Sequence, residues 1–181
     1  LFFPAMIGGL LLPAITSALA GRELLKAREL VTQGLTLSFS GACIIVAILI
    51  GFSNEIITLL AGPTFTPSAV LLRILAIALG VMFLGNIFGF SLIALGKQKA
   101  LAVLYGLLAV GNIALNLIFI PTFGSIAAAW ITVATEALAT GVAGIMVYRH
   151  IRWNISLRRN TFVALAALCS VSLSVILLAQ T

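Results

Sequence analysis

Long apolar runs dominate the pattern of hydrophobic and polar positions, and glycine, proline and charged residues interrupt them at intervals. A helix that crosses a bilayer needs ~20 mostly apolar residues. Six stretches meet this requirement: about 1–20, 34–52, 68–95, 100–120, 124–148 and 161–179. Strands of a membrane β-barrel would alternate over about ten residues, whereas these runs are longer and apolar on every face. The pattern therefore predicts an all-α integral membrane protein, a six-helix transmembrane bundle.

Composition agrees with a membrane protein and narrows its chemistry. Hydrophobic residues make up 62% of the chain and charged residues 8%, against about 45–50% and about 25% in soluble domains. Nucleic acid is not an expected partner, because a basic binding patch needs polar surface that this chain lacks. Cys43 and Cys169 both lie in apolar runs without the spacing of a metal site or disulfide framework, so we expect no metal and no cofactor.

Positive charge is concentrated in alternate connections between the predicted helices. The net charge is +6, and nine of the ten lysines and arginines fall in three connections. These three are 21–33, 97–99 and 149–160, whereas the connections 53–67 and 121–123 contain none. Short loops rich in Lys and Arg remain in the cytoplasm, so we expect the three basic connections there. The segment 149–160 is then a basic cytoplasmic loop before an additional helix in 161–181.

The segment 21–33 is amphipathic, with Leu24, Ala27 and Val31 on one helical stripe. We favour a solvated cytoplasmic extension of the helix that follows. The alternative is an interfacial helix on anionic lipid, against which the acidic residues Glu23 and Glu29 argue.

Glu136 is the acidic residue predicted nearest the middle of the membrane, at the centre of 124–148. An ionisable residue at the bilayer centre costs roughly 2.5 to 3.5 kcal/mol, so it usually faces a bundle interior or a wet cavity. Two interpretations stay open. Glu136 is either a neutral acid that hydrogen-bonds a neighbouring helix, or part of a substrate or cation pathway.

Arg73 lies near the outward end of 68–95, away from the basic connections. Its guanidinium could extend to the outer interface or point into a cavity, where it would suit a phosphate group. Asn112 and Asn116 are four residues apart and share a helix face, with Asn86, and Thr132 or Thr135, as candidate interior partners on other helices. Hydrogen bonding between helices, worth ~0.6–2 kcal/mol per contact, is favoured for the two asparagines over substrate binding.

Several motifs in order give the chain a family resemblance. They are Leu60-Ala61-Gly62 with Phe65, Leu72-Arg73-Ile74-Leu75, Ala94-Leu95-Gly96-Lys97, and Asn116 followed by Pro121-Thr122-Phe123-Gly124. From about residue 1 to 150 the sequence resembles the C-terminal half of polysaccharide biosynthesis and export proteins. These are Wzx-type flippases of lipid-linked oligosaccharides, in the superfamily that includes the multidrug and toxin extrusion (MATE) exporters. The chain therefore reads as a fragment, with residues 1–148 as helices of the C-terminal lobe and the N-terminal lobe missing.

The resemblance implies a bacterial inner-membrane transporter that moves an undecaprenyl-pyrophosphate-linked glycan across the membrane by alternating access. Arg73, Asn112 and Asn116 are then candidate substrate-binding residues, and Glu136 is the candidate for coupling to a proton or sodium gradient. Membrane lipids, the missing lobe and polysaccharide assembly proteins are the other expected partners.

Three other functions compete with a flippase. A MATE-type multidrug or cation antiporter would share the fold, although such exporters usually carry several membrane-embedded acids. A membrane enzyme is not expected, because the chain has no Asp and a single His, His150, in a predicted loop. A structural membrane subunit is the third alternative, in which Arg73 and Glu136 only hold helices together.

Overall fold

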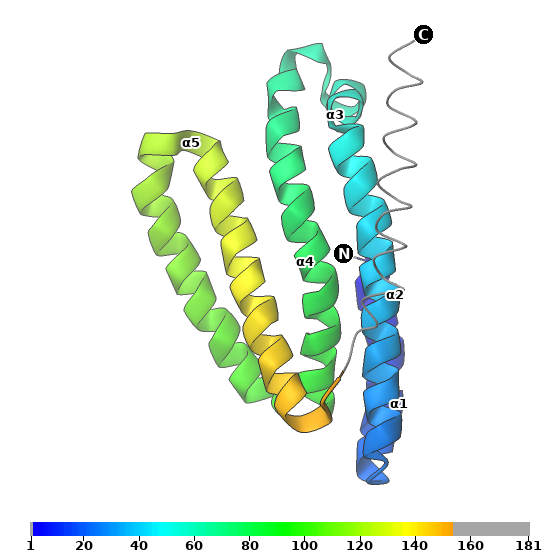
Figure 1. Ribbon diagram of the computed structural model, residues 1–181. Helices are drawn as coiled ribbons and strands as arrows, with labels where there is room; N and C mark the ends of the chain where they lie inside the picture. The colour runs from blue at the N-terminus through cyan, green and yellow to red at the C-terminus, as the bar shows by residue number, and fades with distance from the viewer. Residues whose placement is uncertain (1, 154–181) are drawn as a thin grey trace.

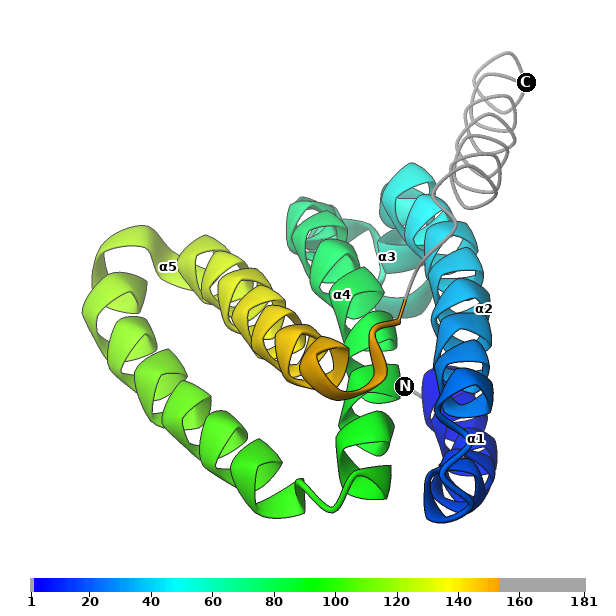
Figure 2. The same cartoon turned by 60° about the horizontal axis from the view of Figure 1, so that its bottom comes forward.

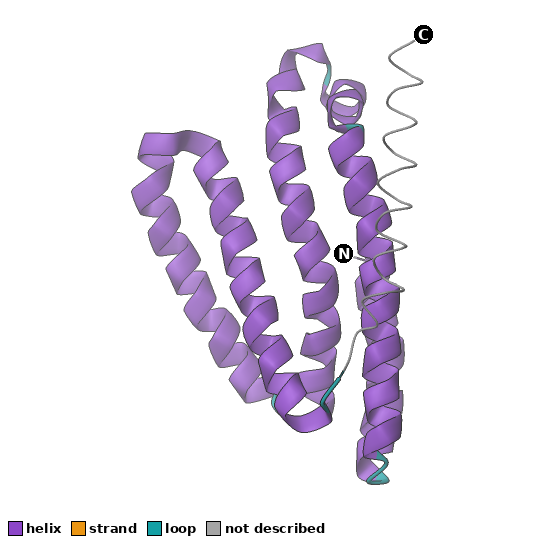
Figure 3. Ribbon diagram, viewed as in Figure 1, coloured by secondary structure: helices purple, strands orange, loops and turns teal. Residues whose placement is uncertain are grey.

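The computed structural model describes residues 2–153, and within them every regular element is a helix (Figure 3). The elements are α1 (Phe2–Ala20), α2 (Leu24–Gly51), α3 (Ser53–Ala61), the short 3-10 helix η1 (Pro63–Ser68), α4 (Ala69–Ala94) and α5 (Gln98–Ile151). The predicted all-α class is therefore confirmed for this part of the chain. The predicted helix 161–179 and most of the basic loop lie outside the described residues, so the count of six helices stays a prediction.

Three segments are long and apolar enough to cross a membrane: Leu24–Gly51, Pro63–Ala94 and Gln98–Ile151. The last segment is two helical arms, because Gly124 interrupts it with φ 65° and ψ −153°, a backbone conformation that essentially only glycine adopts. Figure 1 shows α5 reversing direction at this point. The first arm, 98–123, and the second arm, 125–151, correspond to the predicted spans 100–120 and 124–148.

Two connections differ from the sequence prediction. The segment 24–33 is the first part of α2, which leaves only 21–23 as a turn and agrees with the favoured helical extension. The connection 53–67 was expected as a loop but contains α3 and η1. These elements were not predicted because neither is long enough to resemble a membrane span.

Helix α4 is the centre of the bundle and contacts α1 and α2 as well as α5 (Figure 2). A buried cluster joins Ile15 of α1 and Leu35 of α2 to Ile87 of α4 and Val147 of α5. Each of these four side chains is at most 1% exposed. Apolar packing therefore fixes α4 against its neighbours on both sides.

The turns at 21–23 and 95–97 and the end of α5 lie at one end of the bundle (Figure 1). The turn after α4 is closed by Gly96 at φ 70°, with the amide of Lys97 donating to the carbonyl of Leu92 over 2.8 Å. This is the geometry of a glycine-terminated helix. Of the described lysines and arginines, all except Arg73 lie at or near this end, which we call the basic end: Arg22, Lys26, Arg28, Lys97, Lys99, Arg149 and Arg152.

Candidate functional site

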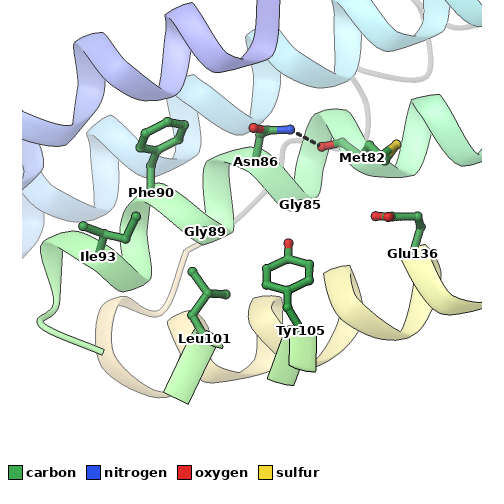
Figure 4. A pocket seen from close by; sticks show the side chains of 9 residues that line it. All are labelled: Met82, Gly85, Asn86, Gly89, Phe90, Ile93, Leu101, Tyr105 and Glu136. Atoms are coloured by element: carbon green, nitrogen blue, oxygen red, sulfur yellow. Dashed lines mark hydrogen bonds between the residues drawn. The ribbon is translucent and has the colours of Figure 1, made fainter. Parts of the chain in front are cut away.

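A pocket of about 250 Å³ lies between α4 and the two arms of α5. Figure 4 shows the side chains that line it. They come from all three helical segments: Met82, Gly85, Asn86, Gly89, Phe90 and Ile93 of α4, Leu101 and Tyr105 of the first arm, and Glu136 of the second. Most of the lining is apolar, so its few polar groups determine what it can bind.

Glu136 supplies the charged group of this pocket. It is half-buried, and its carboxyl group projects from the second arm towards α4 (Figure 4). Within the described part of the chain, the carboxyl group has neither a cationic partner nor a hydrogen-bond donor. It lies twelve residues beyond the reversal at Gly124, or about 18 Å along the helix at 1.5 Å per residue. The acid therefore sits deep within the apolar length of the bundle.

Tyr105 and Asn86 add the other polar groups. The phenol of Tyr105 points towards α4 in Figure 4, and Tyr105 lines the same pocket as Glu136. The side-chain amide of Asn86 donates to the carbonyl of Met82 over 3.0 Å. This internal bond uses one of its amide hydrogens and orients the side chain. The pocket thus combines a carboxyl group, a phenol and a carboxamide. The oxygen atoms of all three can face a cation or accept a hydrogen bond, and the carboxyl group can also carry a proton.

Close approach between α4 and the second arm positions the pocket. A methyl group at Gly85 would lie 2.6 Å from Oγ1 of Thr140, so only glycine fits this contact without a shift. Thr140 in turn donates to the carbonyl of Val81 over 3.4 Å. One turn further along α5, Gly144 lies against the ring of Phe88. The small residues allow Glu136 to approach the face of α4 that carries Asn86.

Asn112 and Asn116 form a separate polar chain between the arms. The amide of Asn116 donates to Oδ1 of Asn112 over 2.8 Å, and the amide of Asn112 donates to Oγ1 of Thr135 over 3.0 Å. The second bond links the two arms directly, as interhelical hydrogen bonding predicts. Oδ1 of Asn116 is buried and has no hydrogen-bond partner in the part of the chain that the structure describes. The two asparagines do not line the Glu136 pocket, although Asn116 borders a second, largely apolar pocket with Pro121.

Arg73 lies away from both pockets, near the end of α4 opposite the basic end. Its Nε donates to Oγ of Ser53, the first residue of α3, over 2.6 Å. The side chain is exposed, whereas Ser53 is completely buried. The structure therefore does not bring Arg73 together with Glu136, and Asn112 and Asn116 form a third group.

Tyr105 was not identified from the sequence as a candidate site residue. The sequence does contain a signal for Tyr105. Tyr105, Asn112 and Asn116 are spaced by seven and four residues and therefore share a helix face. Asn86 was expected as a partner of the asparagines, yet it lines the Glu136 pocket instead. Thr132 bonds the carbonyl of Ala128 in its own helix.

The described residues contain no group of three or more His, Cys, Asp or Glu side chains that could hold a metal ion. No family model, curated protein or solved structure matches the chain. The resemblance to polysaccharide flippases therefore remains a prediction from its sequence motifs.

Proposed function

We propose that this chain is part of a membrane transporter, with α2, α4 and both arms of α5 crossing a bacterial inner membrane. The lengths and apolar composition of these helices support this placement. Lysine and arginine residues at one end support a cytoplasmic location for the basic end, since positive loops remain inside.

The observation that carries the proposal is Glu136 in the pocket between α4 and α5. An ionisable group at this depth is costly in hydrocarbon, and such residues usually mark a substrate, ion or proton pathway. Packing alone would be served better by an apolar residue. We therefore assign Glu136 to the coupling of transport to a proton or sodium gradient, with Tyr105 and Asn86 beside it.

For the substrate, we propose a lipid-linked oligosaccharide that crosses from the cytoplasmic to the outer leaflet by alternating access. This part of the proposal depends on the sequence motifs that resemble Wzx-type flippases. In such a protein, residues 1–148 would be the second of two lobes, and the cavity would lie between the lobes. The exposed guanidinium of Arg73 is the candidate contact for pyrophosphate, and Asn112 and Asn116 are candidates for glycan hydroxyl groups.

A cation or multidrug antiporter is the second candidate, and the pocket gives a specific reason to keep it. Glu136 is the charged residue of the lining, and no lysine, arginine or histidine accompanies it. A carboxylate that shares a pocket with Tyr105 suits a cation, because aromatic rings attract positive charge. A structural subunit is the third candidate.

The test is complementation with the complete gene in a bacterial strain that lacks its own flippase. We expect the native protein to restore glycan on the outer leaflet at matched membrane levels. Resistance to cationic drugs without restored glycan would move the assignment to the antiporter. If neither appears although the protein is inserted, the transport proposal is wrong and a structural role is favoured.

In the same strain, the variant Arg73→Ala tests the proposed substrate contact separately from the proposed coupling residue. If Arg73 contacts pyrophosphate, this variant loses glycan export while remaining inserted. Arg28→Ala is the matched control, because Arg28 is an exposed arginine at the basic end. Equal export by both variants would remove Arg73 from the substrate path.

A further inference from the structure

The connection between α2 and α4 presents apolar side chains that the rest of the described chain does not cover. Leu59 is 85% exposed, Leu60 79% and Phe65 56%. They lie in α3 and η1, at the end of the bundle opposite the basic end (Figure 1).

Helix α3 is amphipathic despite having only nine residues. At 100° per residue, Ile56, Ile57 and Leu60 fall on one side, whereas Asn54 and Thr58 fall on the other. Its first residue, Ser53, is fully buried and accepts the 2.6 Å hydrogen bond from Arg73. The start of α3 is thus fixed to α4, and its last turn carries the exposed leucines.

The orientation of α3 differs from that of the long helices. Figure 1 shows α3 nearly end on, whereas α2 and α4 run from top to bottom of the picture, so α3 lies across the end of the bundle. The apolar part of α2, 34–51, has a length of about 27 Å at 1.5 Å per residue. This approaches the hydrocarbon thickness of about 30 Å. Because α3 begins two residues after α2 ends, it lies at the level where the hydrocarbon meets the headgroups.

We propose that α3 and η1 form an interfacial anchor that binds the lipid surface opposite the basic end. Lipid is the partner because the exposed apolar surface continues from α3 onto the outer faces of the membrane-crossing helices, through Ile48 of α2 and Val70 of α4. Between Glu29 and Arg73 the sequence has a single charged residue, Glu55, so little opposes insertion. Amphipathic helices of this kind bury their apolar side about 5–10 Å deep. This inference depends on the proposed membrane insertion.

The test uses the 181-residue chain with Cys43 and Cys169 replaced by alanine. Single cysteines at three exposed positions then carry an environment-sensitive fluorophore: Leu60→Cys on the apolar side of α3, Thr58→Cys on its polar side, and Leu117→Cys on α5 as an insertion reference. The labelled proteins are reconstituted into phosphatidylglycerol–phosphatidylethanolamine vesicles. Quenching is measured with lipid nitroxides near the headgroup or deep in the chains, and with aqueous iodide.

We expect the Leu60 label to lose most of its fluorescence to the headgroup-level nitroxide, and the Thr58 label to iodide. The Leu117 label should respond to the deep nitroxide. Iodide quenching of the Leu60 label as strong as at Thr58, with Leu117 still in lipid, would overturn the anchor and leave insertion intact. Iodide quenching at Leu117 would instead contradict membrane insertion and the anchor with it.

Discussion

On the side of α4 that faces α1 and α2, apolar side chains such as Leu35 and Ile87 close the contact. On the side that faces α5, Asn86, Tyr105 and Glu136 meet at a pocket. Both sides use glycine for close approach, at Gly34 of α2 and at Gly85 of α4. Buried apolar side chains close the contacts on both sides of α4, but only the side that faces α5 also has a pocket with a carboxyl group, which makes this contact the candidate site.

The largest expected effect on stability comes from Gly85→Ala. Its methyl group would meet Oγ1 of Thr140 at 2.6 Å, and turning this hydroxyl away would break its hydrogen bond to the carbonyl of Val81. We expect a loss of about 1–3 kcal/mol, as for other overpacked contacts, measured by unfolding in mixed detergent micelles. In Gly89→Ala the new methyl group lies 3.9 Å from Leu101, so this control should be neutral or more stable. Equal stability of both variants would show that Gly85 does not limit the approach of α5.

The bond between Asn112 and Thr135 gives the next largest effect. It joins the two arms over 3.0 Å, and interhelical bonds of this type contribute ~0.6–2 kcal/mol. A double-mutant cycle with Asn112→Leu and Thr135→Val should give a coupling energy in this range. Thr132→Val is the matched control, because among the described contacts the hydroxyl of Thr132 bonds only a carbonyl of its own helix. Additive losses for Asn112 and Thr135 would exclude a stabilising bond between the arms.

Ser38 should give the smallest effect, and one of opposite sign. Its side chain is fully buried in α2, and Oγ has no hydrogen-bond partner among residues 2–153. A buried hydroxyl without a partner is destabilising, so we expect Ser38→Ala to increase the free energy of unfolding by about 1 kcal/mol. Ser40→Ala, at a less buried position of the same helix, should change it less. A loss of stability in Ser38→Ala would reveal a partner for this hydroxyl.

The sequence predicted the helices well because their length is set by apolar runs. The predicted span 68–95 differs from α4, Ala69–Ala94, by one residue at each end. Gly124 was the first residue of the predicted span 124–148, and its positive φ is what reverses the chain there. Helix α3 could not be predicted in the same way, since a nine-residue helix is too short to leave a span-like pattern.

Individual candidate residues could be predicted from the sequence, but their arrangement in space could not. The depth of Glu136 follows from its place in an apolar run, whereas its neighbours depend on how α5 is rotated about its axis. That rotation is set by contacts such as Gly85 with Thr140 and Gly144 with Phe88, between residues far apart in sequence. In the sequence alone, an aromatic residue in an apolar run resembles any lipid-facing side chain, and Tyr105 was missed for this reason.

The most direct test of the central claim is gradient-driven transport by the complete protein in vesicles that contain a labelled lipid-linked glycan. Native protein is compared with Glu136→Gln and with Glu55→Gln, the same substitution in exposed α3 outside the pocket. We expect a proton or sodium gradient to accelerate transport by the native protein and Glu55→Gln. Glu136→Gln should lose this acceleration by roughly tenfold or more, equivalent to at least about 1.4 kcal/mol. Gradient-driven transport by Glu136→Gln at the native rate would contradict the assignment of Glu136 as the coupling residue.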